Sequence, residues 1–238
     1  MGLTVRHVSK SFGTKKAVDS ISFSMDEPGV FGLIGTNGAG KTTTIKMILG
    51  LLSIDSGSIL VDGHNVETDF EQAMRHISGI VENPDMYGYL SGYDNLLIHA
   101  RACGVAESRV QEVAELVGMQ MRIREKFKSY SLGMKQRLGV AQALLGSPQL
   151  IILDEPTVGL DPAQVIELRR LIRELGRTHT VILSSHILSE VKAVCDKALI
   201  LSQGHLAAVV DLAAEERDLE ELFLELTAPE ETSDKKED

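Results

Sequence analysis

The 238-residue chain lacks the residues and runs that mark several specialised classes of protein. It holds only two cysteines, Cys103 and Cys195, which excludes a disulfide-stapled scaffold and indicates a reducing compartment. We expect both thiols to be buried as small apolar side chains. No stretch approaches the roughly 18 consecutive apolar residues of a membrane span, so we expect none. With 43% hydrophobic and 24% charged residues, the composition excludes disorder along the whole chain.

Negative charge is concentrated at the C-terminal end. The net charge is −10, and residues 211–238, with 12 acidic and 3 basic side chains, account for −9 of it. The near-neutral remainder gives no sign of a basic face, so we expect no nucleic-acid partner. Asp218 is expected to cap a helix, and residues 228–238 are expected to be disordered. The apolar side of that helix consists of Leu219, Leu222, Phe223 and Leu226.

Short apolar runs alternate with helical patterns along the chain. The runs expected to be strands are 3–8, 21–25, 30–34, 57–62, 77–81, 150–153, 181–184 and 198–201. Helices are expected over 42–51, after Ser131, and after Ser108, where Gln111 would complete a capping box. Strands that alternate with helices predict an α/β fold with a mostly parallel sheet. The helical stretch from about Pro84 to Pro148 then forms an insert.

A glycine-rich motif stands directly after the apolar run 30–34. Its residues fit G-x-x-x-x-G-K-[ST] and are Gly35, Thr36, Asn37, Gly38, Ala39, Gly40, Lys41, Thr42 and Thr43. Glycines let consecutive backbone N–H groups converge on phosphate oxygens, and a helix beginning near Lys41 adds the positive end of its dipole. We expect Lys41 to reach the β- and γ-phosphates of a nucleotide and the Thr42 hydroxyl to ligate Mg²⁺.

Two adjacent carboxylates supply the second half of such a site. The apolar run 150–153 ends in Asp154 and Glu155. Asp154, at the strand end, is expected to hold the magnesium through water. Glu155 is one residue further, so it points elsewhere and could polarise an attacking water. Together with the glycine-rich motif, this segment predicts a nucleoside triphosphatase. A GTPase is disfavoured because the chain lacks an Asn-Lys-x-Asp segment for reading guanine.

Further segments make the chain resemble the ATP-binding subunits of ATP-binding cassette (ABC) transporters, over nearly all of residues 3–226. The segment Tyr130-Ser131-Leu132-Gly133-Met134 stands where that family has its Leu-Ser-Gly-Gly-Gln signature, and Ser131 and Gly133 match it. The segment Gly159-Leu160-Asp161-Pro162 resembles the family's loop at the dimer interface. His186 stands where the family has a switch histidine on the γ-phosphate, and Phe12 where it stacks an aromatic ring on adenine.

The resemblance implies a single ABC ATPase domain with a P-loop NTPase (RecA-like) core, an antiparallel β subdomain and an inserted helical subdomain. The core would comprise residues 1–83 and 150–210, the helical subdomain 84–149, and an acidic helix and tail 211–238. The implied activity is ATP hydrolysis. The resemblance implies that the nucleotide is bound by the whole glycine-rich motif and by Phe12, Glu82, Ser131, Gly133, Asp161 and His186. The resemblance implies catalytic roles for Lys41, Glu155 and His186. It also implies that Thr42, Glu82 and Asp154 hold Mg²⁺.

The resemblance also implies partners. The phosphate motif and the signature would lie on opposite sides of the chain, so two chains, identical or paralogous, would pair head-to-tail around two ATP molecules. Separate integral-membrane permease subunits would carry the translocation path. The complex would place this chain at the cytoplasmic face of a bacterial membrane.

Two segments are similar to one branch of the family, the exporters of bacitracin and lantibiotic peptides. Glu82 replaces the family's usual glutamine, Pro84 and Tyr87 follow it, and residues 130–137 read Tyr-Ser-Leu-Gly-Met-Lys-Gln-Arg. These features predict an exporter that gives resistance or self-immunity. A transporter of unrelated cargo and a membrane signalling complex stay open. A cassette protein of DNA repair or translation is disfavoured, because such proteins usually carry two cassettes or a long coiled-coil insert, and this sequence shows neither.

Overall fold

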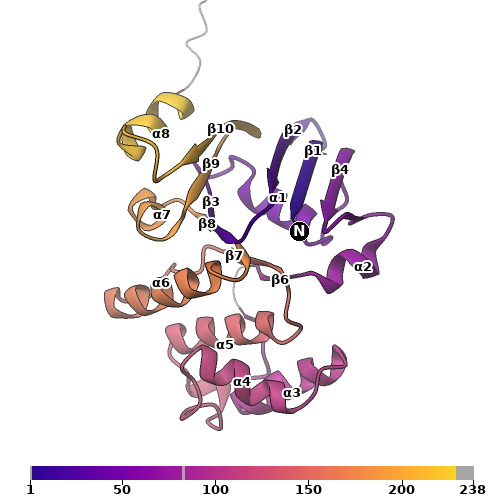
Figure 1. The fold of residues 1–238 in the computed structure, drawn as a ribbon, viewed down its shortest axis with the longest axis vertical. Helices are drawn as coiled ribbons and strands as arrows, with labels where there is room; N and C mark the ends of the chain where they lie inside the picture. Colours follow the sequence, from indigo (N-terminus) through magenta and orange to yellow (C-terminus); the bar gives the residue numbers. More distant parts are fainter. Residues whose placement is uncertain (1, 82–83, 229–238) are drawn as a thin grey trace, which may run out of the picture.

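The computed structural model describes residues 2–81 and 84–228, which form two β-sheets and the helices packed against them (Figure 1). The strands are β1 (Leu3–Phe12), β2 (Lys15–Met25), β3 (Gly29–Gly35), β4 (Ser56–Val61), β5 (His64–Asn65), β6 (Ile77–Ile80), β7 (Leu150–Asp154), β8 (Thr180–Ser185), β9 (Lys197–Ser202) and β10 (His205–Asp211). The helices are α1 (Lys41–Ile48), α2 (Phe70–Arg75), α3 (Gly92–Ala102), α4 (Ser108–Leu116), the 3₁₀ turn η1 (Phe127–Ser129), α5 (Leu132–Leu144), α6 (Pro162–Gly176), α7 (Leu188–Val194) and α8 (Leu219–Thr227).

The larger sheet has the strand order β10-β9-β3-β8-β7-β6. All neighbours in it run parallel except β10, which pairs antiparallel with β9. Every residue of β3 is buried, as the apolar run 30–34 predicts, because the strand has neighbours on both sides and is covered on both faces. The predicted α/β fold with a mostly parallel sheet is confirmed.

Alternate side chains of the central strands enter two different hydrophobic cores. On β3, Val30 and Ile34 join the core formed with α6, α7 and the helices α3 to α5. Phe31 and Leu33 join the core formed with α1 and the smaller sheet. Successive side chains of a strand point to opposite faces, so the larger sheet is the middle layer between these two cores.

The smaller sheet has the order β2-β1-β4-β5 and is antiparallel throughout. It is the antiparallel β part that the resemblance implies. Helices α3, α4 and α5 lie between β6 and β7 in the chain, although those two strands are direct neighbours in the sheet. The three helices therefore form an insert, which lies at one end of the molecule (Figure 1). The division at residues 83/84, 149/150 and 210/211 stays a prediction.

The local expectations have mixed outcomes. Asp218 caps α8, as predicted, and the helix expected after Ser131 is α5, with Ser131 as its N-cap. The capping box at Ser108 is wrong: Ser108 is the first helical residue of α4, Glu107 is the N-cap, and no side chain caps that end. Cys195 is buried as expected, whereas Cys103 is exposed. Cys103 lies just beyond the end of α3, where the chain turns at the surface, so the fold gives its thiol no cover.

Several elements extend beyond their apolar runs. Strand β1 extends beyond its apolar run to Phe12, and strand β2 begins before its apolar run, at Lys15. The polar residues in these extensions are in strands because β1 and β2 pair with each other there. Strand β10 was not expected, and it forms by pairing with β9. Within the described residues, none of the helices combines the length and the apolar character that a membrane span needs. Of residues 228–238, which are expected to be disordered, Ala228 is the C-cap of α8, and residues 229–238 lie outside the described residues.

Candidate functional site

The glycine-rich loop connects the carboxyl end of β3 to the start of α1. Gly40, the N-cap residue of α1, has φ of 106°, and a Cβ built on it would lie 2.7 Å from the Ala17 carbonyl oxygen on β2. Only glycine is compatible with both this backbone conformation and this close approach. The first backbone N–H groups of α1 have no partner within the helix, so they face the loop as donors for an anion.

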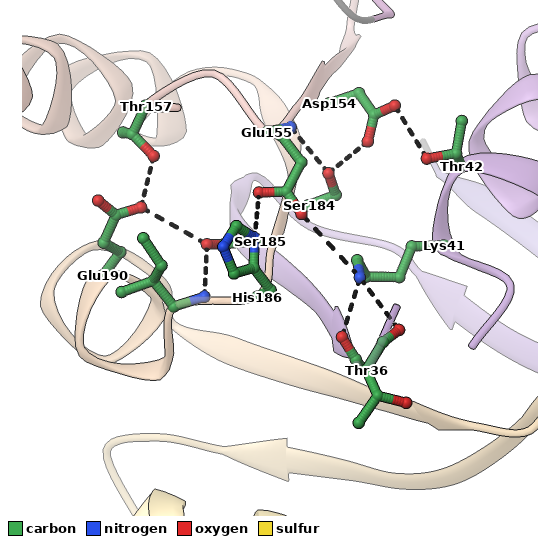
Figure 2. A network of polar contacts seen from close by, with 12 residues as sticks. Thr36, Lys41, Thr42, Asp154, Glu155, Thr157, Ser184, Ser185, His186 and Glu190 are labelled. Carbon is green, nitrogen blue, oxygen red and sulfur yellow. Dashed lines mark hydrogen bonds and ion pairs between the residues drawn. The ribbon is translucent and has the colours of Figure 1, made fainter. Parts of the chain in front are cut away.

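The Lys41 ammonium group lies within this loop. The Lys41 side chain is buried, with the residue 7% exposed, and Nζ donates to the Gly35 carbonyl oxygen at 2.9 Å and the Thr36 carbonyl oxygen at 3.4 Å. The Glu155 Oε1 atom lies 4.0 Å from Nζ (Figure 2). A buried ammonium needs compensation by negative charge, and phosphate oxygens at the helix end would supply it.

Asp154 and Thr42 meet across the gap between β7 and α1. The Thr42 Oγ1 hydroxyl donates to Asp154 Oδ2 at 3.2 Å, and the Ser184 hydroxyl donates to Asp154 Oδ1 at 2.5 Å. Ser184 belongs to β8, which pairs with β7 so that Asp154 and Ser184 are register partners. A carboxylate and a hydroxyl oxygen at this distance form a hard oxygen donor set, which is the kind that Mg²⁺ prefers. The residues present therefore fit a magnesium site.

Glu155 points away from Asp154, as the sequence predicts. Its backbone has φ of 48°, in the left-handed region that a non-glycine residue adopts only when its surroundings impose it. Its N–H donates to Ser184 Oγ at 2.8 Å, which helps to hold this conformation. Its carboxylate then turns toward His186, whose Nδ1 lies 2.9 Å from Glu155 Oε2 (Figure 2). The left-handed backbone conformation at the end of β7 thus orients the candidate base, Glu155, toward the candidate switch histidine, His186.

Gly40, Lys41, Thr42 and Glu155 border one cavity of about 430 Å³, whereas Asp154 and His186 are not part of its lining. Its lining residues are Phe12, Lys15, Ala17, Asn37, Gly38, Gly40, Lys41, Thr42, Thr43 and Glu155. Phe12 lies at the rim with 52% of its surface exposed, which leaves a ring face for a planar base to stack on. No motif points to Lys15 and Ala17. They reach the cavity because β2 pairs with β1, with Lys15 opposite Phe12.

The signature residues lie elsewhere. Ser131 Oγ accepts from the Met134 N–H at 3.3 Å at the start of α5, and Asp161 Oδ1 accepts from the Gln164 N–H at 2.9 Å at the start of α6. A Cβ added to Gly133 would lie 2.7 Å from Gln164 Cδ, so Gln164 packs directly on that glycine. Ser131, Gly133 and Asp161 therefore form a second group, and the cavity lining includes none of them.

Tyr130 anchors the chain just before the signature helix. It is buried, and its hydroxyl donates to the Arg122 carbonyl oxygen at 2.9 Å. Burial raises the pKa of Tyr130 to about 12, so the phenol stays neutral and keeps donating this hydrogen bond. Glu82, the remaining candidate ligand, lies outside the described residues.

A protein-family model and several known proteins match most of this chain. The family model described as "ABC transporter" matches residues 18–158. The uncharacterized ABC transporter ATP-binding protein YhcH of Bacillus subtilis (strain 168) is 46% identical over 219 residues, which are 91% of this chain and 72% of that protein. The bacitracin transport ATP-binding protein BcrA of Bacillus licheniformis is 44% identical over 202 residues, covering 84% of this chain and 66% of that one.

A third relative and a solved structure match along most of their own length. The lantibiotic transport ATP-binding protein SrtF of Streptococcus pyogenes is 39% identical over 222 residues, covering 93% of this chain and 95% of that protein. A solved structure described as the ATP binding subunit of an ABC transporter superposes with a TM-score of 0.84 at 30% identity, covering 95% of this chain and 99% of that one. This likeness confirms the P-loop NTPase fold.

Proposed function

The chain belongs to the ATP-binding proteins of ABC transporters, and from that premise we propose that it powers the export of an antimicrobial peptide of the bacitracin or lantibiotic type. It is an ATP hydrolase, as members of this family are. Two relatives, one named for bacitracin transport and one for lantibiotic transport, support the peptide class, since they match over most of this chain.

The observation that carries the proposal is the joining of Lys41, Thr42 and Glu155 around one cavity whose rim bears Phe12. Lys41 and the N-terminus of α1 bind the phosphates, and Phe12 stacks on the adenine. Thr42 and Asp154 hold Mg²⁺, which when bound neutralises charge on the phosphate oxygens. Glu155 accepts a proton from the attacking water, and His186 holds the Glu155 carboxylate in place.

We infer further that the working unit is a head-to-tail dimer. The signature residues are not part of the lining of the nucleotide cavity in their own chain, and α5 presents a helix N-terminus at Ser131 with the small residue Gly133 beside it. Such an end, with a hydroxyl, suits a γ-phosphate held by the second chain. Each nucleotide would then contact both chains. Hydrolysis removes those contacts and lets the dimer open.

The remaining parts of the proposal concern the assembly. Integral-membrane permease subunits form the translocation path for the cargo, and this chain attaches to them from the cytoplasmic side of a bacterial membrane. Residues 1–83 and 150–210 form the nucleotide-binding part, and residues 84–149 the helical part with the signature. The segment from Glu82 to Ala102 contacts the permeases.

Glu155→Gln tests the dimer and the hydrolysis step together. Because the amide cannot accept the proton, turnover should fall by about 100-fold or more while ATP still binds. The variant should therefore accumulate as an ATP-bound dimer in size-exclusion chromatography with Mg²⁺ and ATP. Glu155→Gln combined with Lys41→Ala is the control and should stay monomeric. A monomer in both samples would contradict the head-to-tail dimer.

The cargo is tested in cells. Deleting the gene should increase sensitivity to bacitracin or to a lantibiotic, and expression of the wild-type chain, but not of Glu155→Gln, should restore resistance. Unchanged sensitivity to both classes would contradict the peptide proposal and leave the ATPase assignment standing.

A further inference from the structure

A buried carboxylate lies just behind the candidate catalytic residues. Glu190, on α7, is 6% exposed, and it does not line the nucleotide cavity. A carboxylate this deeply buried is costly unless hydrogen bonds and a positive charge compensate it. Its contacts therefore show what it serves.

Glu190 accepts two hydroxyl hydrogen bonds and faces one guanidinium group. Its Oε2 atom accepts from Thr157 Oγ1 at 2.5 Å and from Ser185 Oγ at 3.5 Å (Figure 2). Its Oε1 atom lies 3.6 Å from Arg169 Nη2, on α6. Hydrogen bonds with a charged acceptor are stronger than neutral ones, so this carboxylate can hold both hydroxyls.

The two hydroxyls belong to the two segments that carry Glu155 and His186. Thr157 is the second residue after Glu155, in the turn that follows β7. Ser185 directly precedes His186, and its Oγ also accepts from the Ile187 N–H at 3.0 Å. Ser185 therefore fixes the backbone on both sides of His186 and connects that turn to Glu190. One buried carboxylate thus joins both segments.

The backbone at Glu155 needs such support. Its left-handed conformation is disfavoured for a side chain of this size and persists only if flanking contacts impose it. The Ser184 hydroxyl holds Glu155 from the amino side, and the hydrogen bond from Thr157 to Glu190 holds the turn on the carboxyl side. If that turn relaxed, the 2.9 Å contact between Glu155 and His186 would open.

We propose that Glu190 is a positioning residue for hydrolysis, whose carboxylate holds Thr157 and Ser185 and so keeps Glu155 and His186 in register. This inference rests on the proposed roles of Glu155 and His186. It assigns no contact with nucleotide to Glu190. The network therefore acts on the rate of hydrolysis and leaves nucleotide binding unchanged.

The test uses Thr157, because its hydroxyl can be removed with little change of shape. Thr157→Val should lower kcat for ATP by about 10- to 100-fold, because small misplacements of a catalytic group have effects of this size. The KM for ATP and the melting temperature should change little. Thr157→Ser keeps the hydroxyl and should restore most of kcat.

Glu190→Gln tests the other end of the hydrogen bond. Its neutral amide is a weaker acceptor for the Thr157 hydroxyl and carries no charge for Arg169, so it should lower kcat in the same direction as Thr157→Val. In the double variant the two losses should be less than multiplicative, since both changes act on the same interaction. Lys192→Ala, on the exposed side of α7, is the matched control and should keep wild-type kcat. All variants are compared in the full chain, in the assembly that hydrolyses ATP.

Each of the following results would overturn the proposal: wild-type kcat in Thr157→Val, no recovery in Thr157→Ser, or multiplicative losses in the double variant. A rise in KM with unchanged kcat would also overturn it. If Glu190→Gln fails to fold, the comparison of Thr157→Val with Thr157→Ser still tests the proposal. Failure of the proposed function would be distinct, because Glu155→Gln would then hydrolyse ATP like the wild type.

Discussion

Replacing Ser131 by alanine separates two roles of one hydroxyl group. In the isolated chain, Ser131 Oγ accepts a hydrogen bond from the Met134 N–H and caps α5. The distance of 3.3 Å is long for such a bond, so its loss should cost about 0.5–1 kcal/mol, the lower part of the range for N-caps. For a chain of this size the melting temperature should fall by about 1–4 °C.

The second role is the one we propose for the head-to-tail dimer, where the hydroxyl would donate to the γ-phosphate held by the other chain. A hydrogen bond to a charged group contributes about 1.5–3 kcal/mol. If that contribution is made in the transition state, its loss corresponds to about a 10- to 140-fold decrease in turnover, at about 1.4 kcal/mol for each factor of ten. Because Ser131 does not line the cavity of its own chain, ATP binding to the isolated chain should not change.

Three assays separate these effects: steady-state ATP hydrolysis, equilibrium binding of ATP to the isolated chain, and thermal unfolding. Ser131→Asn is the control, because asparagine caps a helix as well as serine does but does not present a hydroxyl. It should recover the melting temperature and not the turnover. Wild-type turnover in Ser131→Ala would refute the reasoning, and so would a loss of ATP affinity that matched the loss of turnover.

Three other changes have clear expected outcomes. Lys41→Ala removes the ammonium that lies in the glycine-rich loop and should abolish ATP binding, so micromolar affinity in calorimetry would refute the phosphate site. A thiol reagent at pH 8 should modify one cysteine quickly in the native protein, the exposed Cys103, and a second only after denaturation. Burial raises the pKa of Cys195 to about 12, so its thiol stays protonated and unreactive at that pH, and two fast thiols would contradict this. Glu82→Gln should change ATPase activity or its coupling to transport, and no difference in either assay would leave the carboxylate without a role.

The local parts of the site can be predicted from the sequence because short segments determine them. The apolar run 30–34 becomes a fully buried strand, the following glycines form the loop, and Lys41 begins a helix. The segment ending in Asp154 becomes another fully buried strand, β7. A helix begins after Ser131 and Asp218 caps α8 as expected, because helix starts depend on a few consecutive residues.

Contacts between distant segments could not be predicted in the same way. The exposure of Cys103 depends on where the end of α3 lies in the fold, and Lys15 reaches the cavity because β1 and β2 pair as long strands. The capping box at Ser108 fails although its residues fit the pattern, since the helix begins one residue earlier than that pattern requires.

The sequence by itself determined a phosphate-binding loop, a pair of acidic residues at a strand end and the family of the protein, because each is written in consecutive residues. Only the tertiary structure decided that Glu155 faces His186 and that Glu190 joins the two segments that carry them. Those relations depend on which strands become neighbours and on which side chains lose contact with water, and neither is encoded within one segment.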